Sequence, residues 1–281
     1  MRIEIMPTEA AVGAEIRGVD LSEPLGAEDF ATVENAFNEH GVVFFRNQTL
    51  TPDQQLAFTH RFGDLVFNTF GETNGLPGYA GIVVISNVVQ DGREIGVRRA
   101  GHAWHSDMCY TAKPPRGTML YAHEVPMQNG LVLGDTCFAN TSAAYTALPA
   151  DMQQRLDGMQ AVFNFAARKR SSPVTPAQIE AFPEVVHPVV RTHPMTGRKC
   201  LYMMRDDCTG LVDVVDTEAQ LLIAALADHV IRPEFIYRHQ WQPGDLLLWD
   251  NCTVQHIAIQ DYDLPLRRLM HRTTFGALPT S

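Results

Sequence analysis

Residues 245–256 read DLLLWDNCTVQH, an apolar run followed by polar residues that end at His256. The turn signal Pro243-Gly244 precedes this run, and the combination predicts a buried strand over 245–249 that leads through a turn to His256. Segments rich in valine, leucine, threonine and aromatic residues predict further strands at 82–85, 118–122, 186–192, 200–204 and 268–275.

Helical patterns lie at the front of the chain and in insertions between the strands. Apolar spacing and end signals predict helices over 27–40, 150–158 and 217–230. Another helix begins at Thr51, where Pro52 suits the first helical position and Gln54 can close a capping box. Thr217 and Gln220 predict a second capping box, at the start of the last helix.

Strands dominate the middle and the end of the chain. This distribution predicts a mostly β protein in which helices flank an antiparallel core, and a double-stranded β-helix (jelly-roll, cupin-like) fits the pattern. Periodicity alone does not separate this fold from another β-sandwich. No repeat or long linker divides the chain, so residues 1–281 are expected to form a single domain. Residues 71–103 are expected to form a lid, and residues around 150–185 a helical insertion.

The composition excludes several classes of protein. The chain has 22 Lys and Arg residues against 32 Asp and Glu, a net charge of −10, so binding to nucleic acid or to an anionic membrane is not expected. No run reaches the ~18 apolar residues of a membrane span, and the N-terminus lacks the apolar run of a signal peptide. Five cysteines without a C-x-x-C pair argue against a zinc knuckle or a disulfide framework and favour a reduced, cytoplasmic protein.

His105 and Asp107 form a His-x-Asp motif within the tetrapeptide WHSD. On an extended backbone, residues i and i+2 point to the same side, so the imidazole and the carboxylate can reach one metal ion. The motif alone is weak, because most short matches of this kind are uninformative. His256 can complete the site if its segment lies beside this one. Two histidines and one carboxylate cover one face of an octahedron and leave three positions open, the ligand arrangement of non-haem Fe(II) oxygenases.

The segment RRLMHRTTF (267–275) predicts a strand with two arginines on one face. Arg268 and Arg272 share that face, and His271 points to the other. Two inward arginines need anionic partners, because a guanidinium stays charged when buried and binds carboxylates in a bidentate manner. The residues leave two alternatives open, namely an anionic ligand or a salt-bridge network with Asp and Glu side chains.

Taken in order, these motifs resemble those of the Fe(II)/2-oxoglutarate-dependent dioxygenases of the taurine dioxygenase and phenoxyacetate dioxygenase (TauD/TfdA) family. The family pattern is a His-x-Asp motif, a distant histidine and an arginine about a dozen residues later; here Arg268 follows His256 by twelve positions. The resemblance covers nearly the whole chain and includes GAEIRGVDL (13–21), VVFFR (42–46), HRFGDL (60–65), GDT (134–136), HPVVRTHP (187–194) and WDN (249–251).

The resemblance implies a role for each of these side chains. His105, Asp107 and His256 would bind Fe(II). Thr136 and Arg268 would bind the distal carboxylate of 2-oxoglutarate, whose keto acid end chelates the metal and leaves one position for O2. The residue types agree with this implication, because a dianion with one carboxylate at the metal needs a buried cation for the other.

The resemblance also bears on the substrate. Arg272 matches the arginine that faces the substrate anion in taurine dioxygenase. Asn68 stands where that enzyme has a histidine that helps to hold the sulfonate, which argues against taurine. His102 and Met108 are further candidate substrate contacts. The expected substrate is a small organic anion with an apolar or aromatic body, such as an aryloxyalkanoate.

Two alternatives to this function are open at the level of the sequence. One is the same chemistry on an alkylsulfonate or alkyl sulfate such as taurine. The other is a barrel that binds a metal or an anion and has no catalytic activity. Family members are commonly dimers or tetramers, so the resemblance also implies a homo-oligomer.

Overall fold

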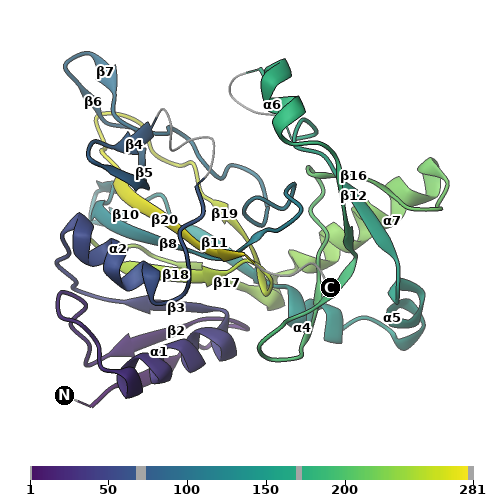
Figure 1. The fold of residues 1–281 in the computed structure, drawn as a ribbon, viewed down its shortest axis with the longest axis horizontal. Coiled ribbons are helices and arrows are strands. Elements are labelled where there is room, and N and C mark those ends of the chain that lie inside the picture. The colour runs from purple at the N-terminus through teal and green to yellow at the C-terminus, as the bar shows by residue number, and fades with distance from the viewer. Residues whose placement is uncertain (1, 68–73, 169–172, 278–281) are drawn as a thin grey trace.

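The computed structural model describes residues 2–67, 74–168 and 173–277, and strands predominate in it (Figure 1). The prediction of a mostly β protein is confirmed. The largest sheet has eight strands, and only the neighbours β2 and β3 run parallel. In spatial order the strands are β1 (Glu4–Pro7), β2 (Ala14–Arg17), β3 (Val42–Phe45), β18 (Leu246–Asp250), β8 (Pro115–Glu124), β20 (Leu269–Ala277), β5 (Tyr79–Ser86) and β4 (Gly75–Leu76).

A three-stranded antiparallel sheet packs on one face of the large sheet, and two helices cover the other face. The small sheet has the order β17 (Ile236–His239), β11 (Thr136–Asn140), β19 (Val254–Ala258), and the helices are α1 (Ala27–His40) and α2 (Pro52–His60). In β18, Leu247 and Trp249 pack with the small sheet, whereas Leu246 and Leu248 pack with the helices. This strand is apolar at consecutive positions because it is covered on both faces.

Both front helices begin where the local signals predict, and the first also ends there. Gly41 follows α1 in the left-handed conformation at φ 65°, and its N–H donates to Phe37 O at 2.9 Å. At the start of α2, the Gln54 N–H donates to Thr51 Oγ1 and the Thr51 N–H donates to Gln54 Oε1, so the predicted capping box is confirmed.

The right-hand part of Figure 1 has its own core of aromatic, leucine and methionine side chains. It contains α4 (Thr141–Thr146), α5 (Ala150–Leu156), β12 (Gln160–Phe163), α6 (Pro176–Ala181), β13 (Val185–Pro188), β14 (Val190–Thr192), β15 (Lys199–Leu201), β16 (Cys208–Leu211), α7 (Asp216–Val230) and the short 3-10 helix η1 (Pro233–Phe235). The prediction of a helical insertion around 150–185 needs correction, because β12 lies between α5 and α6 and is the central strand of the sheet β13-β12-β16.

Two strand predictions in this part are also corrected. Residues 186–192 form two strands in different sheets, because Val189 leaves the ladder and bonds to the backbone of Met159 and Tyr202 instead. The strand predicted over 200–204 ends at Leu201 in β15. Residues 202–204 are buried outside any strand, so their apolar character reflects burial and not strand pairing.

The capping box predicted at Thr217 is wrong. Val215 is the residue that precedes the first turn of α7, and no side chain caps that end. Thr217 therefore lies inside the helix, too late to cap it. The Gln220 side chain instead donates to the Thr209 carbonyl oxygen at 2.9 Å.

Residues 71–73 of the predicted lid over 71–103 lie outside the described residues, and the described part is only partly separate from the scaffold. Within it, β5 pairs with β20 in the large sheet, so residues 79–86 belong to the scaffold. The strands β6 (Val89–Gln90) and β7 (Arg93–Glu94) form a hairpin that projects from the sheet at the top left of Figure 1. A second small hairpin consists of β9 (Met127–Gln128) and β10 (Leu131–Val132).

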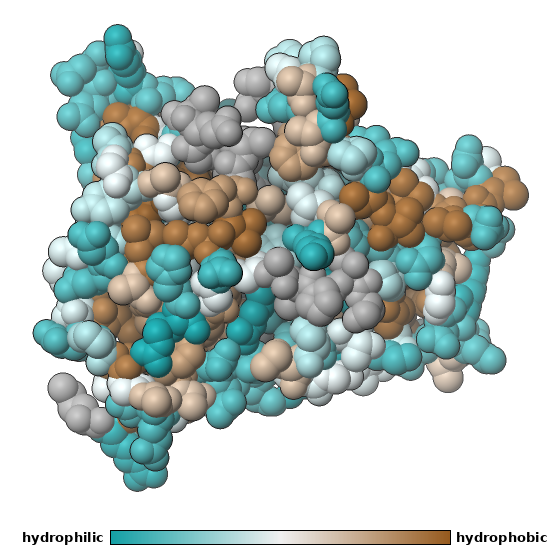
Figure 2. Space-filling model, in the orientation of Figure 1, coloured by the Kyte–Doolittle hydropathy of each residue, from teal (hydrophilic) through white to brown (hydrophobic). Residues whose placement is uncertain are grey.

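The described helices include none with the length and apolar character that a membrane span requires. On the face shown in Figure 2, apolar side chains gather over the region of α7. Val215, just before α7, and Leu221, within it, are 72% and 74% exposed.

Candidate metal and co-substrate site

Backbone pairing brings together the two histidines of the predicted triad. His105 and His256 face each other as an antiparallel bridge: the His105 N–H donates to His256 O at 3.1 Å, and the His256 N–H donates to His105 O at 2.8 Å. His105 therefore lies beside β19. Asp107 is at the start of a turn two positions later, and its carboxylate converges on the same point as the His105 imidazole.

The donor atoms of these three residues suit one divalent cation. The ligand atoms of His105, Asp107 and His256 all lie within 4.8 Å of one another, and all three side chains are buried. Asp107 Oδ1 is 3.6 Å from His105 Nε2 and 3.9 Å from His256 Nε2. The second carboxylate oxygen, Oδ2, accepts a hydrogen bond of 2.6 Å from Thr118 Oγ1. One oxygen of Asp107 thus faces the imidazoles, while Thr118 fixes the other.

The electrostatics keep Asp107 and His256 in the protonation states that a metal ligand needs. Burial alone would raise the pKa of Asp107, but Arg272 and the two histidines outweigh it and hold that pKa well below its usual range. Burial, with the neighbouring His105, holds the pKa of His256 well below its usual range. An ionised carboxylate and a neutral imidazole are the forms that coordinate a cation.

A cavity next to the triad contains the predicted cationic side chains. Arg268 and Arg272 both border it, as does Thr136 at the start of β11. Arg268 is 4% exposed, and its Nε has no hydrogen-bond partner among the described residues. The Arg272 guanidinium lies 2.9 Å from Asp107 Oδ1. The full lining is Ile85, Ala100, Gly101, His105, Asp107, Leu120, Thr136, Trp249, His256, Ala258, Arg268 and Arg272.

The polar groups of this cavity select its ligand. A guanidinium offers hydrogen-bond donors only, and the Thr136 hydroxyl can add another donor. A buried cation with an unsatisfied N–H needs an anionic acceptor, and a carboxylate fits a guanidinium in a bidentate manner. The site can therefore hold a carboxylate at Arg268 and a divalent cation at the triad.

Comparison with known proteins identifies the group to which this arrangement belongs. Residues 4–274 match the family described as taurine catabolism dioxygenase TauD, TfdA family. The chain belongs to the TauD/TfdA family. It is a 2-oxoglutarate-dependent dioxygenase, a class that uses Fe(II), 2-oxoglutarate and O2.

Relatives of this TauD/TfdA chain match it almost from end to end. The alpha-ketoglutarate-dependent 2,4-dichlorophenoxyacetate dioxygenase of Cupriavidus pinatubonensis is 36% identical over 98% of both chains. The alpha-ketoglutarate-dependent sulfate ester dioxygenase of Pseudomonas putida is 32% identical, over 99% of this chain and 91% of its own. The solved structure of AAD-2 in complex with Mn(II) and N-oxalylglycine superposes with a TM-score of 0.85 at 28% identity, over 100% of this chain and 99% of that one.

Two of the other predicted substrate contacts of this TauD/TfdA chain, His102 and Met108, are not among the residues that line the cavity, and the third is not described. Asn68 lies outside the described residues. His102 is exposed, and it is not among the residues that line the cavity. Met108 has a left-handed backbone with φ 50°, and its side chain packs against the core of the right-hand part of the fold. Of the predicted substrate contacts, Arg272 alone lines the cavity among the described residues.

Several residues that shape the site carry no signal in the sequence. Thr118 belongs to β8, eleven positions from Asp107, and its role depends on how β8 packs behind the triad. Asn251 ties down the loop of the triad, because its carbonyl oxygen accepts from Ser106 Oγ at 2.7 Å and its Oδ1 accepts from the Asp107 N–H at 3.3 Å. The only hint was the resemblance of the segment WDN, which gave Asn251 no role.

Tyr262 is another residue beside the site to which the sequence pattern assigns no role. Its ring centroid lies 5.9 Å from the guanidinium carbon of Arg268. The same ring lies over Gly134, where a Cβ atom would be 2.8 Å from it. The Gly134 N–H donates to Asp261 Oδ1 at 2.7 Å, so the loop that carries Tyr262 is tied to the residues just before Thr136.

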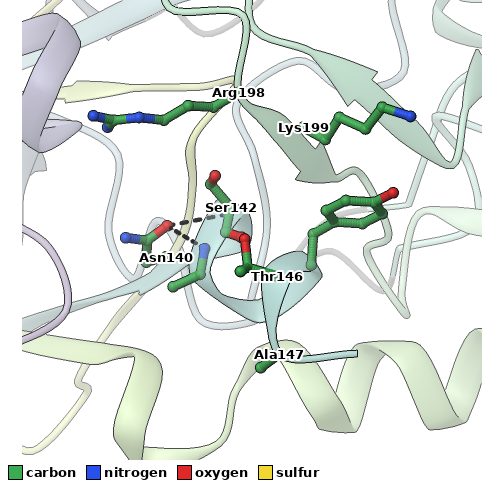
Figure 3. A pocket seen from close by; sticks show the side chains of 8 residues that line it. Asn140, Ser142, Thr146, Ala147, Arg198 and Lys199 are labelled. Carbon is green, nitrogen blue, oxygen red and sulfur yellow. Dashed lines mark hydrogen bonds between the residues drawn. The ribbon is translucent and has the colours of Figure 1, made fainter. Parts of the chain in front are cut away.

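A second hollow, on the surface beside α4, offers no comparable chemistry (Figure 3). Asn140 caps α4 there, accepting from the N–H groups of Ser142 and Ala143 at 3.0 Å. Figure 3 shows Arg198 and Lys199 extending in opposite directions along its rim. Its charged side chains do not converge on one point, so it is not a candidate active site.

Proposed function

We propose that this dioxygenase hydroxylates a C–H bond of a small organic anion, with aryloxyalkanoate carboxylates favoured, and releases succinate and CO2. The observation that carries the proposal is that Arg268 and Arg272 border one cavity beside the triad. Two cations at one cavity provide for two anions, a co-substrate and a substrate. This reading favours an anionic substrate over a neutral one.

The proposal gives each residue of the site a task. His105, Asp107 and His256 hold Fe(II), and Thr118 keeps the Asp107 carboxylate turned toward it. Thr136 and Arg268 hold the distal carboxylate of 2-oxoglutarate. When bound, the iron and 2-oxoglutarate together supply the oxidising chemistry with O2. The chain itself orients the target C–H bond and excludes water.

Arg272 is proposed to bind the substrate anion. In the protein alone it pairs with Asp107 Oδ1 at 2.9 Å, so it has an internal partner until an external anion arrives. The side chains of Ile85, Leu120 and Trp249 border the same cavity and suit an apolar or aromatic substrate body. The 2,4-dichlorophenoxyacetate dioxygenase among the relatives supports this preference, whereas the sulfate ester dioxygenase supports the alternative of an alkyl sulfate.

A substrate panel tests the proposal. Succinate release is measured with Fe(II), 2-oxoglutarate and ascorbate in the presence of aryloxyalkanoates, alkyl sulfates or alkylsulfonates of matched size. We expect the aryloxyalkanoates to stimulate succinate release most strongly. Stronger stimulation by a sulfate or sulfonate would shift the assignment to the alternative, and no stimulation by any of them would place the substrate outside these three classes.

We also propose finer features of the architecture. The two facing sheets would form a double-stranded β-helix within a single domain, and residues 87–103 would act as the lid. Support for the lid comes from Arg98 and Arg99, which form ion pairs with Asp263 at 3.1 and 3.2 Å and so connect this segment to the loop of Tyr262. These contacts are exposed, so they hold the lid weakly.

We further propose that the protein forms a homo-oligomer and is located in the cytoplasm. The exposed Val215 and Leu221 near α7 are apolar surface that a partner copy could bury. The five cysteines are all free and buried, which suits a reducing compartment. Light scattering coupled to size-exclusion chromatography tests the first point, because a mass equal to that of one chain would contradict it.

A further inference from the structure

Trp241 is joined by one hydrogen bond to Thr136, a residue that lines the cavity. Its indole Nε1–H donates to Thr136 Oγ1 at 3.0 Å, and both side chains are buried. An indole nitrogen is a donor only, so the Thr136 oxygen is the acceptor in this bond. We propose that Trp241 is a positioning residue for co-substrate binding, which turns the Thr136 hydroxyl so that its proton meets the distal carboxylate of 2-oxoglutarate. This inference rests on the proposed function, in which Thr136 and Arg268 hold that carboxylate.

The Thr136 hydroxyl can donate its proton to a ligand. Within residues 2–67, 74–168 and 173–277, the bond from Trp241 is the only hydrogen bond recorded for Thr136 Oγ1. Thr136 and Arg268 border the same cavity, and Arg268 Nε has no acceptor in the described protein. The hydroxyl and the guanidinium therefore present donors to one space, which an acceptor with negative charge satisfies.

The turn that carries Trp241 is held firmly enough to orient another residue. Trp241 lies between β17 and β18 and is fully buried. Asp245 Oδ2 pairs with His239 Nε2 at 3.0 Å on one side of it and accepts the Gln242 N–H at 2.8 Å on the other. Arg46 neutralises this buried carboxylate. Thr136 is itself fixed, because it pairs with His239 in β17 and with Ala258 in β19.

The effect of Trp241 is specific to the carboxylate end of the co-substrate. A donated hydrogen bond polarises the Thr136 hydroxyl and strengthens the bond that it donates in turn. A neutral indole adds no charge that would act on the metal end of the ligand. Loss of the indole N–H should therefore weaken a ligand with a distal carboxylate and leave a ligand without one unchanged.

The test compares two ligands on the Mn(II)-loaded protein by isothermal titration calorimetry. One is 2-oxoglutarate, and the other is 2-oxopentanoate, which has a methyl group in place of the distal carboxylate. For Trp241→Phe we expect 2-oxoglutarate to bind about five- to tenfold more weakly, the net effect of one hydrogen bond, with unchanged binding of 2-oxopentanoate and of Mn(II). Tyr237→Phe is the matched control, because it removes a partly buried hydrogen bond to His239 from the same sheet but not the bond to Thr136.

Each outcome has a defined meaning. An unchanged affinity of Trp241→Phe for 2-oxoglutarate overturns the inference, as does an equal loss for both ligands or the same loss in Tyr237→Phe. If the unsubstituted protein itself binds both ligands equally, the proposed carboxylate site at Arg268 fails, and the role of Trp241 fails with it.

A second readout needs no change at Trp241. The indole N–H signals of the 15N-tryptophan-labelled, Zn(II)-loaded protein are assigned with Trp104→Phe and Trp249→Phe. We expect 2-oxoglutarate to move the Trp241 proton signal downfield and 2-oxopentanoate to leave it in place. A signal that does not move, or that moves equally with both ligands, overturns the inference even if Trp241→Phe does not fold.

Discussion

At the scale of single residues, Thr118 determines how Asp107 is presented to a cation. Its hydroxyl donates to Asp107 Oδ2 at 2.6 Å and accepts from Asn251 Nδ2 at 3.4 Å. A carboxylate with one oxygen held in this way offers the other oxygen as a single ligand atom. Residues that orient a metal ligand commonly matter for affinity nearly as much as the ligand itself.

Thr118→Val should therefore weaken metal binding without removing a ligand. We expect the affinity for Mn(II) or Fe(II), measured by titration calorimetry, to fall by about 10- to 100-fold. Thr118→Ser keeps the hydroxyl and serves as the control, with affinity close to that of the unsubstituted protein. Equal affinity in the valine variant would show that Thr118 does not orient the ligand.

Arg268→Ala should separate co-substrate binding from metal binding. Because the Arg268 guanidinium is the proposed partner of the distal carboxylate and Arg272 is paired with Asp107, we expect 2-oxoglutarate to bind about 100-fold more weakly. Mn(II) affinity should stay unchanged. Arg267→Ala is the matched control, since Arg267 is exposed and pairs with Glu124 at 2.6 Å. An Arg268→Ala protein with normal 2-oxoglutarate affinity would remove Arg268 from the site.

At the scale of secondary structure, β11 aligns the two ends of the site. Thr136 pairs with Ala258 and Phe138 pairs with His256 in the ladder between β11 and β19. The residue proposed for the co-substrate and a residue of the triad thus lie on adjacent strands. A shift of β11 by one residue against β19 would turn Thr136 to the opposite face while His256 kept its own, so the ladder itself sets the geometry of the site.

The starts of α2 and α7 can be compared directly, because a side chain caps α2 and none caps α7. Thr51→Ala removes the capping box of α2 and should lower the free energy of unfolding by about 1 kcal/mol. Thr217→Ala lies inside α7, where no side chain caps the helix, and should change it by less than about 0.5 kcal/mol. Urea unfolding monitored by circular dichroism measures both, and equal losses would contradict the assigned helix start.

At the scale of the whole molecule, buried neutral histidines link stability to pH. Burial is the main cause that lowers the pKa of His187 and of His271 to about 4. His187 is fully buried in β13, and His271 is buried in β20 of the large sheet. In the unfolded chain both would titrate near 6.5, so below that pH the unfolded state binds more protons than the folded state.

Stability should therefore be highest above pH 6.5 and fall as the pH drops from 6.5 toward 4. Linkage gives a loss of about 1–2 kcal/mol for each of the two residues by pH 5. Urea unfolding at pH 7, 6 and 5 measures the effect, and His187→Gln should reduce the difference between pH 7 and pH 5. A His187→Gln protein with the full pH dependence would show that His187 does not contribute.

Short-range signals predicted the parts of the molecule that depend on neighbours in sequence. The cap at Thr51 and the end of α1 at Gly41 follow from local backbone preferences, and both are found. The same reasoning failed at Thr217 and over 186–192. In both cases a local pattern was overridden by tertiary contacts, such as the backbone bonds of Val189.

The sequence by itself therefore determined the residue types of the site, the mostly β class and the pairing of His105 with Asp107 on one side of the chain. Only the tertiary structure decided what surrounds them. The hydrogen bonds from Thr118 to Asp107 and from Trp241 to Thr136 join segments whose approach depends on how the sheets pack. Local propensity acts over a few residues, whereas such contacts form only when burial of the shared core brings distant strands together.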